Sequence, residues 1–164
     1  MFEIDITMSR EITFMQEAIR IGLEGMRNNL GGPFGCVIVK DDEIIGKGCN
    51  CVIALNDPTA HAEVVAIRDA CGKIGSFQLE DCEVYTTCEP CPMCMGALYW
   101  ARPKKIYYAN SKADAAAIGF DDSFIYQELS LPINERKMVM HCLNPQEAIN
   151  MFNEWKKMCH KTLY

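Results

Sequence analysis

The sequence lacks any long hydrophobic run and any cluster of basic residues. Among its 164 residues, no apolar stretch approaches the 18 or so that a membrane-spanning helix needs, so we expect no membrane partner. The net charge is -6, which disfavours a general nucleic-acid binder and favours a small neutral or positively charged substrate. The opening residues, MFEIDITMSREITF, lack the basic flank and apolar stretch of a secretory signal. We therefore expect a cytoplasmic protein.

Linkers, low-complexity tracts and internal repeats are also missing from the sequence. Apolar residues make up 49% of the chain and charged residues 23%, proportions that exclude a disordered protein. The length suits one compact unit. We predict a single domain over residues 1–164.

Cysteine, by contrast, is abundant. The ten cysteines are about 6% of the chain, below the 8–10% that is typical of disulfide scaffolds. Most lie in apolar or strand-like settings, where a reduced cysteine behaves as a small buried hydrophobe. Since no export signal is recognised, we expect reduced cysteines in a reducing compartment.

The apolar spacing predicts alternating helices and strands. Residues 9–30 carry apolar residues at intervals of three and four, which line one face of a helix that Gly31 and Gly32 end. The β-rich runs 34–40 and 43–49 flank Asp41-Asp42 and predict a hairpin. Further helices are predicted at 59–72, at 92–100 and from 145 onward, and further strands at 83–87, 105–109 and 137–141. This order predicts an α/β fold of three layers, α/β/α, with a five-stranded mixed sheet flanked by helices.

The last predicted helix has the clearest start signal. Asn144 suits the N-cap, Pro145 the first helical position, and Glu147 follows the cap by three residues. An apolar stripe that we expect to be buried follows at residues 148, 152, 155 and 159.

Two short stretches carry residues that bind metal ions. Cys91 and Cys94 are three apart at the start of a predicted helix, which places both sulfurs on one face, where they can bind the same ion. His61 falls in the opening turn of another predicted helix. One histidine and two cysteines give a tetrahedral zinc three protein ligands and leave the fourth position for water. Zinc lowers the pKa of such a water towards neutrality, which makes hydroxide available.

Glu63 is the natural proton carrier beside this group. It lies two residues beyond His61, close enough to face the same water without binding the metal. The cysteines alone also fit a redox pair, a structural zinc or part of an iron–sulfur cluster, with Cys71 or Cys82 as a further ligand. The combination with His-Ala-Glu favours a catalytic zinc.

The pattern His-x-Glu followed by Pro-Cys-x-x-Cys is the signature of zinc deaminases. Here His61-Ala62-Glu63 is followed, after 26 residues, by Pro90-Cys91-Pro92-Met93-Cys94. The surrounding stretches NDPTAHAEVVAIRDAC and CEPCPMCMGALYWARP resemble the cytidine-deaminase-like superfamily. GGPFGCVIVKD, YWARPKKIYYA, DAAAIGFDDSFIYQEL and the aromatic C-terminus resemble its bacterial guanine deaminase family, so that the resemblance covers residues 14–164.

The resemblance implies a role for each matching residue. These are the zinc ligands His61, Cys91 and Cys94, the proton carriers Glu63 and Asp122, and the substrate contacts Asn50, Phe34 and Tyr164. Asn50 is expected to hydrogen-bond the purine and Phe34 to pack against it. Tyr164 is expected to close the site, in this family from the partner subunit of a domain-swapped homodimer. We add Ala62 and Trp100 as candidates for the pocket wall, although packing of its helix on the core explains Trp100 equally well.

The activity that the resemblance implies is hydrolytic deamination of guanine to xanthine and ammonia, in purine catabolism or salvage. Activated hydroxide would attack C2, with one Zn²⁺ per subunit and Glu63 as the proton shuttle. Guanosine and amino-triazines stay open as alternative substrates. Deamination of adenosine in tRNA shares the motif, but the acidic chain disfavours RNA binding. A non-enzymatic subunit with structural zinc would have no need of Glu63.

Overall fold

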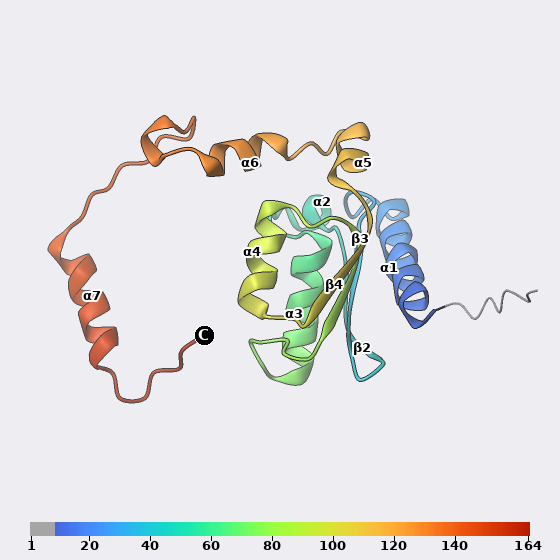
Figure 1. The fold of residues 1–164 in the computed structure, drawn as a ribbon, viewed down its shortest axis with the longest axis horizontal. Helices are drawn as coiled ribbons and strands as arrows, with labels where there is room; N and C mark the ends of the chain where they lie inside the picture. Colours follow the sequence, from blue (N-terminus) through green and yellow to red (C-terminus); the bar gives the residue numbers. More distant parts are fainter. Residues whose placement is uncertain (1–8) are drawn as a thin grey trace, which may run out of the picture. The chain divides into compact units, whose positions relative to one another are not determined.

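The computed structural model describes residues 9–164, and the chain divides into two compact units, Met1–Asp122 and Ser123–Tyr164 (Figure 1). The first unit contains helices α1 (Arg10–Arg27), α2 (Val52–Leu55), α3 (Ala62–Ile74), α4 (Pro92–Ala101) and α5 (Lys112–Ala117), and strands β1 (Gly35–Lys40), β2 (Glu43–Cys49), β3 (Glu83–Cys88) and β4 (Lys105–Asn110). The second contains α6 (Ser123–Ser130), the short 3-10 helix η1 (Ile133–Glu135) and α7 (Gln146–Lys157). Among the described helices, none is both long and apolar enough to cross a membrane.

The strands of the first unit form one mixed sheet in the order β2-β1-β3-β4. β1 pairs antiparallel with β2 and with β3, whereas β3 and β4 are parallel. The turn between β1 and β2 places Asp41 and Asp42 at φ 48° and 65°. Two consecutive positive φ angles are what a type I′ hairpin turn requires. The predicted hairpin is confirmed.

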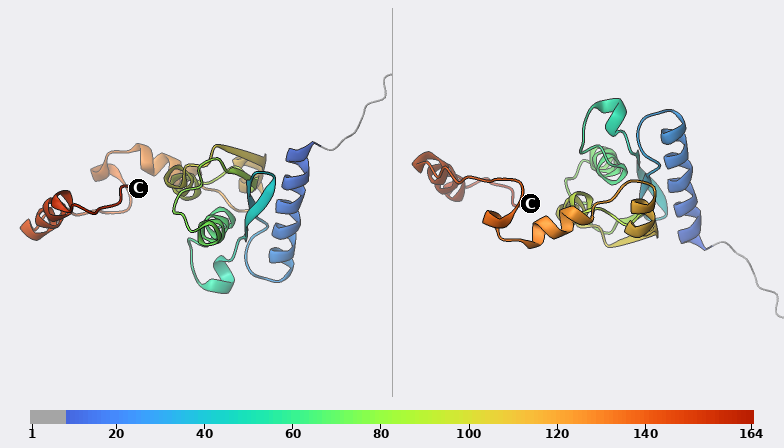
Figure 2. Two further views of the ribbon diagram at one scale, coloured as in Figure 1. Left: turned by 90° about the horizontal axis from the view of Figure 1, so that it is seen from below. Right: turned by 90° about the horizontal axis from the view of Figure 1, so that it is seen from above.

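Helices cover both faces of this sheet, because successive side chains of a strand point to opposite sides. Val37 and Val39 of β1 pack with Ala18 of α1 on one face. Cys36 and Ile38 face the other way, into the core cluster to which α3 and α4 contribute. Figure 2 shows α1 alone on one side of the sheet and α3 with α4 on the other. The three-layer α/β/α prediction is confirmed.

Helix α1 meets the sheet through its small residues. A Cβ added at Gly35 would lie 2.0 Å from the carbonyl oxygen of Ala18 and 2.6 Å from the amide nitrogen of Gly22, so the backbones of α1 and β1 are in direct contact. Most of the predicted apolar stripe is exposed, Ile12 at 48% for example, whereas Met15 of the stripe packs against the core cluster on this face.

The prediction of a fifth strand at residues 137–141 is wrong, since the sheet has four strands in the described part of the chain. These residues form no regular structure in the second unit, and Met138, Val139 and Met140 are exposed. A strand needs a partner for its backbone hydrogen bonds. The second unit contains no other strand, so the β-rich run has nothing to pair with.

Helix α7 also departs from its predicted start. Its N-cap is Pro145, and Asn144 lies outside the helix with a φ of 43°. The predicted N-cap at Asn144 and first helical position at Pro145 are therefore wrong. Phe152 and Trp155 of the apolar stripe are exposed.

Candidate metal centre

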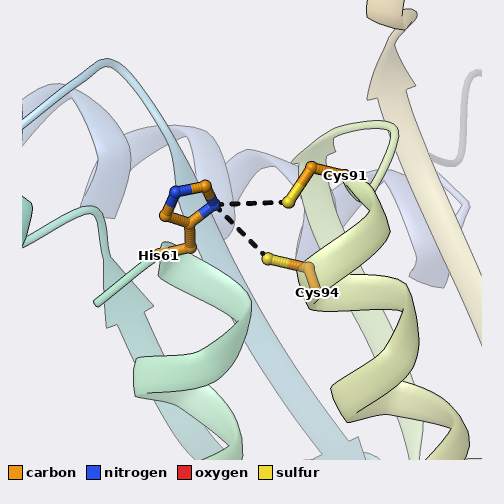
Figure 3. Close-up of side chains that lie close together, drawn as sticks. All are labelled: His61, Cys91 and Cys94. Atoms are coloured by element: carbon orange, nitrogen blue, oxygen red, sulfur yellow. Dashed lines mark hydrogen bonds between the residues drawn. The ribbon is translucent and has the colours of Figure 1, made fainter. Parts of the chain in front are cut away.

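Three predicted metal ligands lie at the N-terminal ends of two neighbouring helices. His61 is the N-cap of α3 and Cys91 the N-cap of α4, both with extended backbone, and Cys94 follows in the first turn of α4. Figure 3 shows the imidazole and the two thiols pointing towards one another from these helix ends. The adjacent helix N-termini favour the thiolate forms that metal binding requires.

The distances within this group fit a tetrahedral zinc ion. Nδ1 of His61 lies 3.5 Å from Sγ of Cys91 and 3.5 Å from Sγ of Cys94. Tetrahedral zinc with ordinary bond lengths places nitrogen and sulfur ligands about 3.6 Å apart. Among the described residues no other side chain joins the group, so neither Cys71 nor Cys82 supplies a fourth ligand.

The protonation states of the two thiols differ. Hydrogen bonding with Cys94, and then with His61, lowers the pKa of Cys91 to about 4. The same bond to Cys91, followed by burial, raises the pKa of Cys94, which therefore keeps its proton. The bond with Cys91 raises the pKa of His61. The group thus contains one ready thiolate, and a metal ion displaces the remaining protons when it binds.

Glu63 lies beside the ligand group, in the first turn of α3, and is only 6% exposed. The Thr86 hydroxyl donates to Oε1 at 3.1 Å, and the Cys94 thiol donates to Oε2 at 3.3 Å. Burial raises the pKa of Glu63. The carboxyl group is thus held in one orientation, and its raised pKa makes it a stronger proton acceptor than an exposed glutamate.

A cavity of about 600 Å³ brings together most of the residues that the sequence singles out. Its walls include Phe34, Asn50, His61, Ala62, Glu63, Cys91 and Asp122. Burial, and then the proximity of Cys91, raises the pKa of Asp122. Trp100 does not line this cavity, and its side chain on α4 is 65% exposed. Tyr164 belongs to the second unit.

The cytidine and deoxycytidylate deaminase zinc-binding region matches residues 8–110, which include the whole ligand group and Glu63. The chain belongs to this deaminase family. His61, Cys91 and Cys94 form a group that could hold the zinc ion of this family.

Three relatives show how similarity extends along this deaminase. Guanine deaminase from Bacillus subtilis is 51% identical over 152 residues, which cover 93% of this chain and 97% of the relative, and its X-ray structure matches with a TM-score of 0.90. A guanine deaminase structure from Nitrosomonas europaea is 30% identical, with a TM-score of 0.65, over 70% of this chain and 65% of that one. A tRNA-specific adenosine deaminase from Aquifex aeolicus is 49% identical over 77 residues, 47% of this chain and 51% of the relative.

The sequence analysis did not identify several residues that line the cavity or that support Glu63. Phe120 meets Phe34 edge-to-face, with ring centroids 4.9 Å apart, and both rings line the cavity. Glu89 is a further carboxylate in the wall, and Thr86 orients Glu63 from the neighbouring strand. Phe120 directly precedes Asp121-Asp122, so the stretch that carries the family resemblance already contained a signal for it.

Replacing Cys94 with serine should abolish stoichiometric zinc binding, because a hydroxyl is a far weaker zinc ligand than a thiolate. Metal analysis of the purified protein measures this loss directly. Cys142→Ser is the matched control, since that thiol is exposed and lies outside the ligand group. Full zinc content in the Cys94→Ser protein would contradict the assignment.

Proposed function

We propose that this deaminase hydrolyses guanine to xanthine and ammonia. The observation that carries the proposal is the 51% identity to a guanine deaminase across 93% of the chain. Similarity to tRNA-specific adenosine deaminases is weaker over a comparable length, at 34% identity over 76% of the chain for one of them. The cavity volume of about 600 Å³ also suits a purine base.

The chemistry divides between the metal and the two proton carriers. His61, Cys91 and Cys94 would hold a zinc ion, which when bound would supply an activated water for hydrolysis at C2 of guanine. Glu63 would accept a proton from the attacking water and pass it to the adjacent ring nitrogen N3, which would make C2 more electrophilic. Thr86 keeps the Glu63 carboxyl in place during the transfer.

The leaving amine needs a second proton transfer, because an amide anion is a prohibitive leaving group. Asp122 lines the same cavity, and burial raises its pKa, so its carboxyl group holds a proton more readily than an exposed aspartate does. Glu63 and Asp122 together can deliver the protons that convert the amine into ammonia. Phe34 and Phe120 provide apolar surface against which the base packs.

We also propose a domain-swapped homodimer in the cytoplasm, with a purine as substrate and no nucleic-acid or membrane partner. Residues 123–164 would pack on the partner subunit, with Tyr164 closing the partner's site. The exposed apolar residues of α7, Phe152 and Trp155 among them, support this proposal, because such a face is ordinarily covered by another surface. Residues 1–164 would then form one deaminase domain whose C-terminal segment is exchanged between subunits.

Purified, zinc-replete protein should release ammonia rapidly from guanine, and guanosine, cytosine and adenosine should be inert in parallel assays. The reason is that Asn50, Phe34 and Asp122 line a cavity assigned to a free purine base. If ammonia were released from another base and not from guanine, the proposed substrate would be wrong, while zinc-dependent hydrolysis would still be supported.

Glu63→Gln should retain zinc and lose about 10²- to 10⁴-fold in kcat, because glutamine keeps the shape of the side chain and cannot carry the proton. Ammonia release and metal content are measured on the same sample. Glu43→Gln serves as the matched control, since that carboxylate is exposed at the start of β2, lies outside the cavity wall and should leave turnover unchanged. Near-normal turnover by Glu63→Gln would refute the shuttle role.

Deleting Tyr164 should lower turnover of guanine at least tenfold while the protein stays dimeric, because one terminal side chain closes the site but contributes little to the whole interface. Turnover and light scattering on the same sample separate the two effects. Unchanged turnover would count against a closing role, and a monomeric full-length protein would contradict the swapped dimer.

A further inference from the structure

Two cysteines flank Asn50 in the segment that joins β2 to α2. Cys49 is the last residue of β2, and Cys51 is the N-cap of α2. Their sulfur atoms lie 3.5 Å apart, and one thiol hydrogen-bonds to the other. Both residues are half-buried, and neither belongs to the metal ligand group. The deamination chemistry uses neither thiol, so a role for the pair lies outside that chemistry.

The pair is close to the geometry of a disulfide. A disulfide bond is about 2.0 Å long, so the two sulfurs need to approach each other by only about 1.5 Å. Cys49 has little room to move, because it lies against α1. A Cβ added at Gly25 would lie 2.7 Å from both Cβ and Sγ of Cys49. Most of the approach must therefore come from Cys51.

The protonation state of Cys49 indicates the order in which the two thiols would react. Burial, and then the hydrogen bond with Cys51, raises the pKa of Cys49 to about 11. Cys49 therefore keeps its proton at neutral pH and attacks an oxidant poorly, because the thiolate is the reactive form. This assigns the first oxidation to Cys51 and leaves Cys49, held next to it, as the thiol that closes the bond.

We propose that Cys49 and Cys51 are a redox-sensitive modification site, which a peroxide converts into a disulfide, and that this closure lowers turnover. The Cys51 sulfur first attacks hydrogen peroxide and breaks its O–O bond, which leaves a sulfenic acid on Cys51 and releases one water. The Cys49 sulfur then attacks the Cys51 sulfur. The S–S bond forms, and the sulfenic hydroxyl leaves with the proton of Cys49 as a second water. Overall, two electrons pass from the sulfurs to the peroxide.

Closing this disulfide would move a wall of the cavity. Asn50 is the only residue between the two cysteines, so the ring that the disulfide closes runs through its backbone. Asn50 lines the cavity, and its Oδ1 accepts hydrogen bonds from the amide of Gly32 at 3.2 Å and the amide of Val52 at 3.3 Å. A shift of Cys51 towards Cys49 changes the backbone between them and would disturb both hydrogen bonds.

The same shift would reach the metal end of the cavity. The amide of Cys51 donates to the carbonyl oxygen of Ala60 at 2.9 Å, and Ala60 directly precedes the metal ligand His61. A displacement of about 1 Å in a catalytic site can lower turnover by about 10²-fold. We therefore expect the disulfide form to turn over roughly 10- to 100-fold more slowly than the dithiol form.

Peptide mapping tests the modification without any assay of turnover. Trypsin cleaves after Lys47 and Arg68, so residues 48–68 form one peptide that contains Cys49 and Cys51 and no other cysteine. Zinc-replete protein is treated with hydrogen peroxide, and its remaining thiols are alkylated. We expect this peptide to have lost two hydrogen atoms and to carry no alkyl group. Two alkylated cysteines, or a gain of oxygen in place of the loss of hydrogen, would overturn the proposal.

Turnover of the same samples tests the functional consequence. Ammonia release is measured with whichever base the reduced protein deaminates, so the guanine assignment can fail without deciding this test. Peroxide should lower turnover roughly 10- to 100-fold with zinc content unchanged, and dithiothreitol should restore it. A disulfide with full turnover, or a loss of turnover that follows loss of zinc, would overturn the link to the cavity.

Single variants separate this pair from the other cysteines. Cys51→Ser should turn over at close to the unmodified rate and should lose the sensitivity to peroxide, and Cys49→Ser should behave in the same way. Cys142→Ser is the matched control, since it removes an exposed thiol elsewhere in the chain and should stay as sensitive as the unmodified protein. Sensitivity that persists in both variants of the pair would show that other cysteines are responsible and would overturn the proposal.

Discussion

The direct contact between helix α3 and strand β2 is the constraint on which the metal centre depends. A Cβ at Gly48 would lie 2.2 Å from the carbonyl oxygen of Ala62, and a Cβ at Gly46 would lie 2.6 Å from that of Ala66. Only glycine on the strand allows the helix backbone to approach so closely. This contact fixes the N-terminal turn of α3, and with it the two residues, His61 and Glu63, that must face the metal.

The chemistry of this site also ties the metal to the stability of the fold. Glu63 is buried beside Cys94, and Cys91 holds a thiolate next to it. Removing negative charge from water is costly unless a positive charge compensates it. A bound zinc ion compensates this cluster, and anything that binds the folded state alone stabilises it. The interaction that holds the zinc ion in the site would therefore also stabilise the first unit.

The sequence predicted the features that depend on the spacing of nearby residues. It did not predict the features that depend on contacts with residues far away in the chain. The ligand group follows from Cys91 and Cys94 on one helical turn together with the His-Ala-Glu stretch, and the structure brings them together. Thr86, by contrast, reaches Glu63 across 23 residues of chain, which no periodicity encodes. Residues 137–141 have the composition of a strand, yet nothing in the second unit pairs with them. In α1, Gly22 and Gly25 form the buried face, because close backbone approach outweighs the apolar stripe that periodicity detects.

The metal ligands and Asn50 are held in place in the cavity by different parts of the fold. Side chains at helix N-termini form the metal end, and there the geometry follows from how α3 and α4 pack on the sheet. Backbone amides hold Asn50, whose orientation follows from the loop at Gly31-Gly32. A site with fixed polar groups discriminates chiefly by rejection, because a ligand that leaves a buried donor unpaired loses far more binding than a missing methylene would cost. Selectivity in this deaminase should therefore depend more on the polar groups of the ring than on its size.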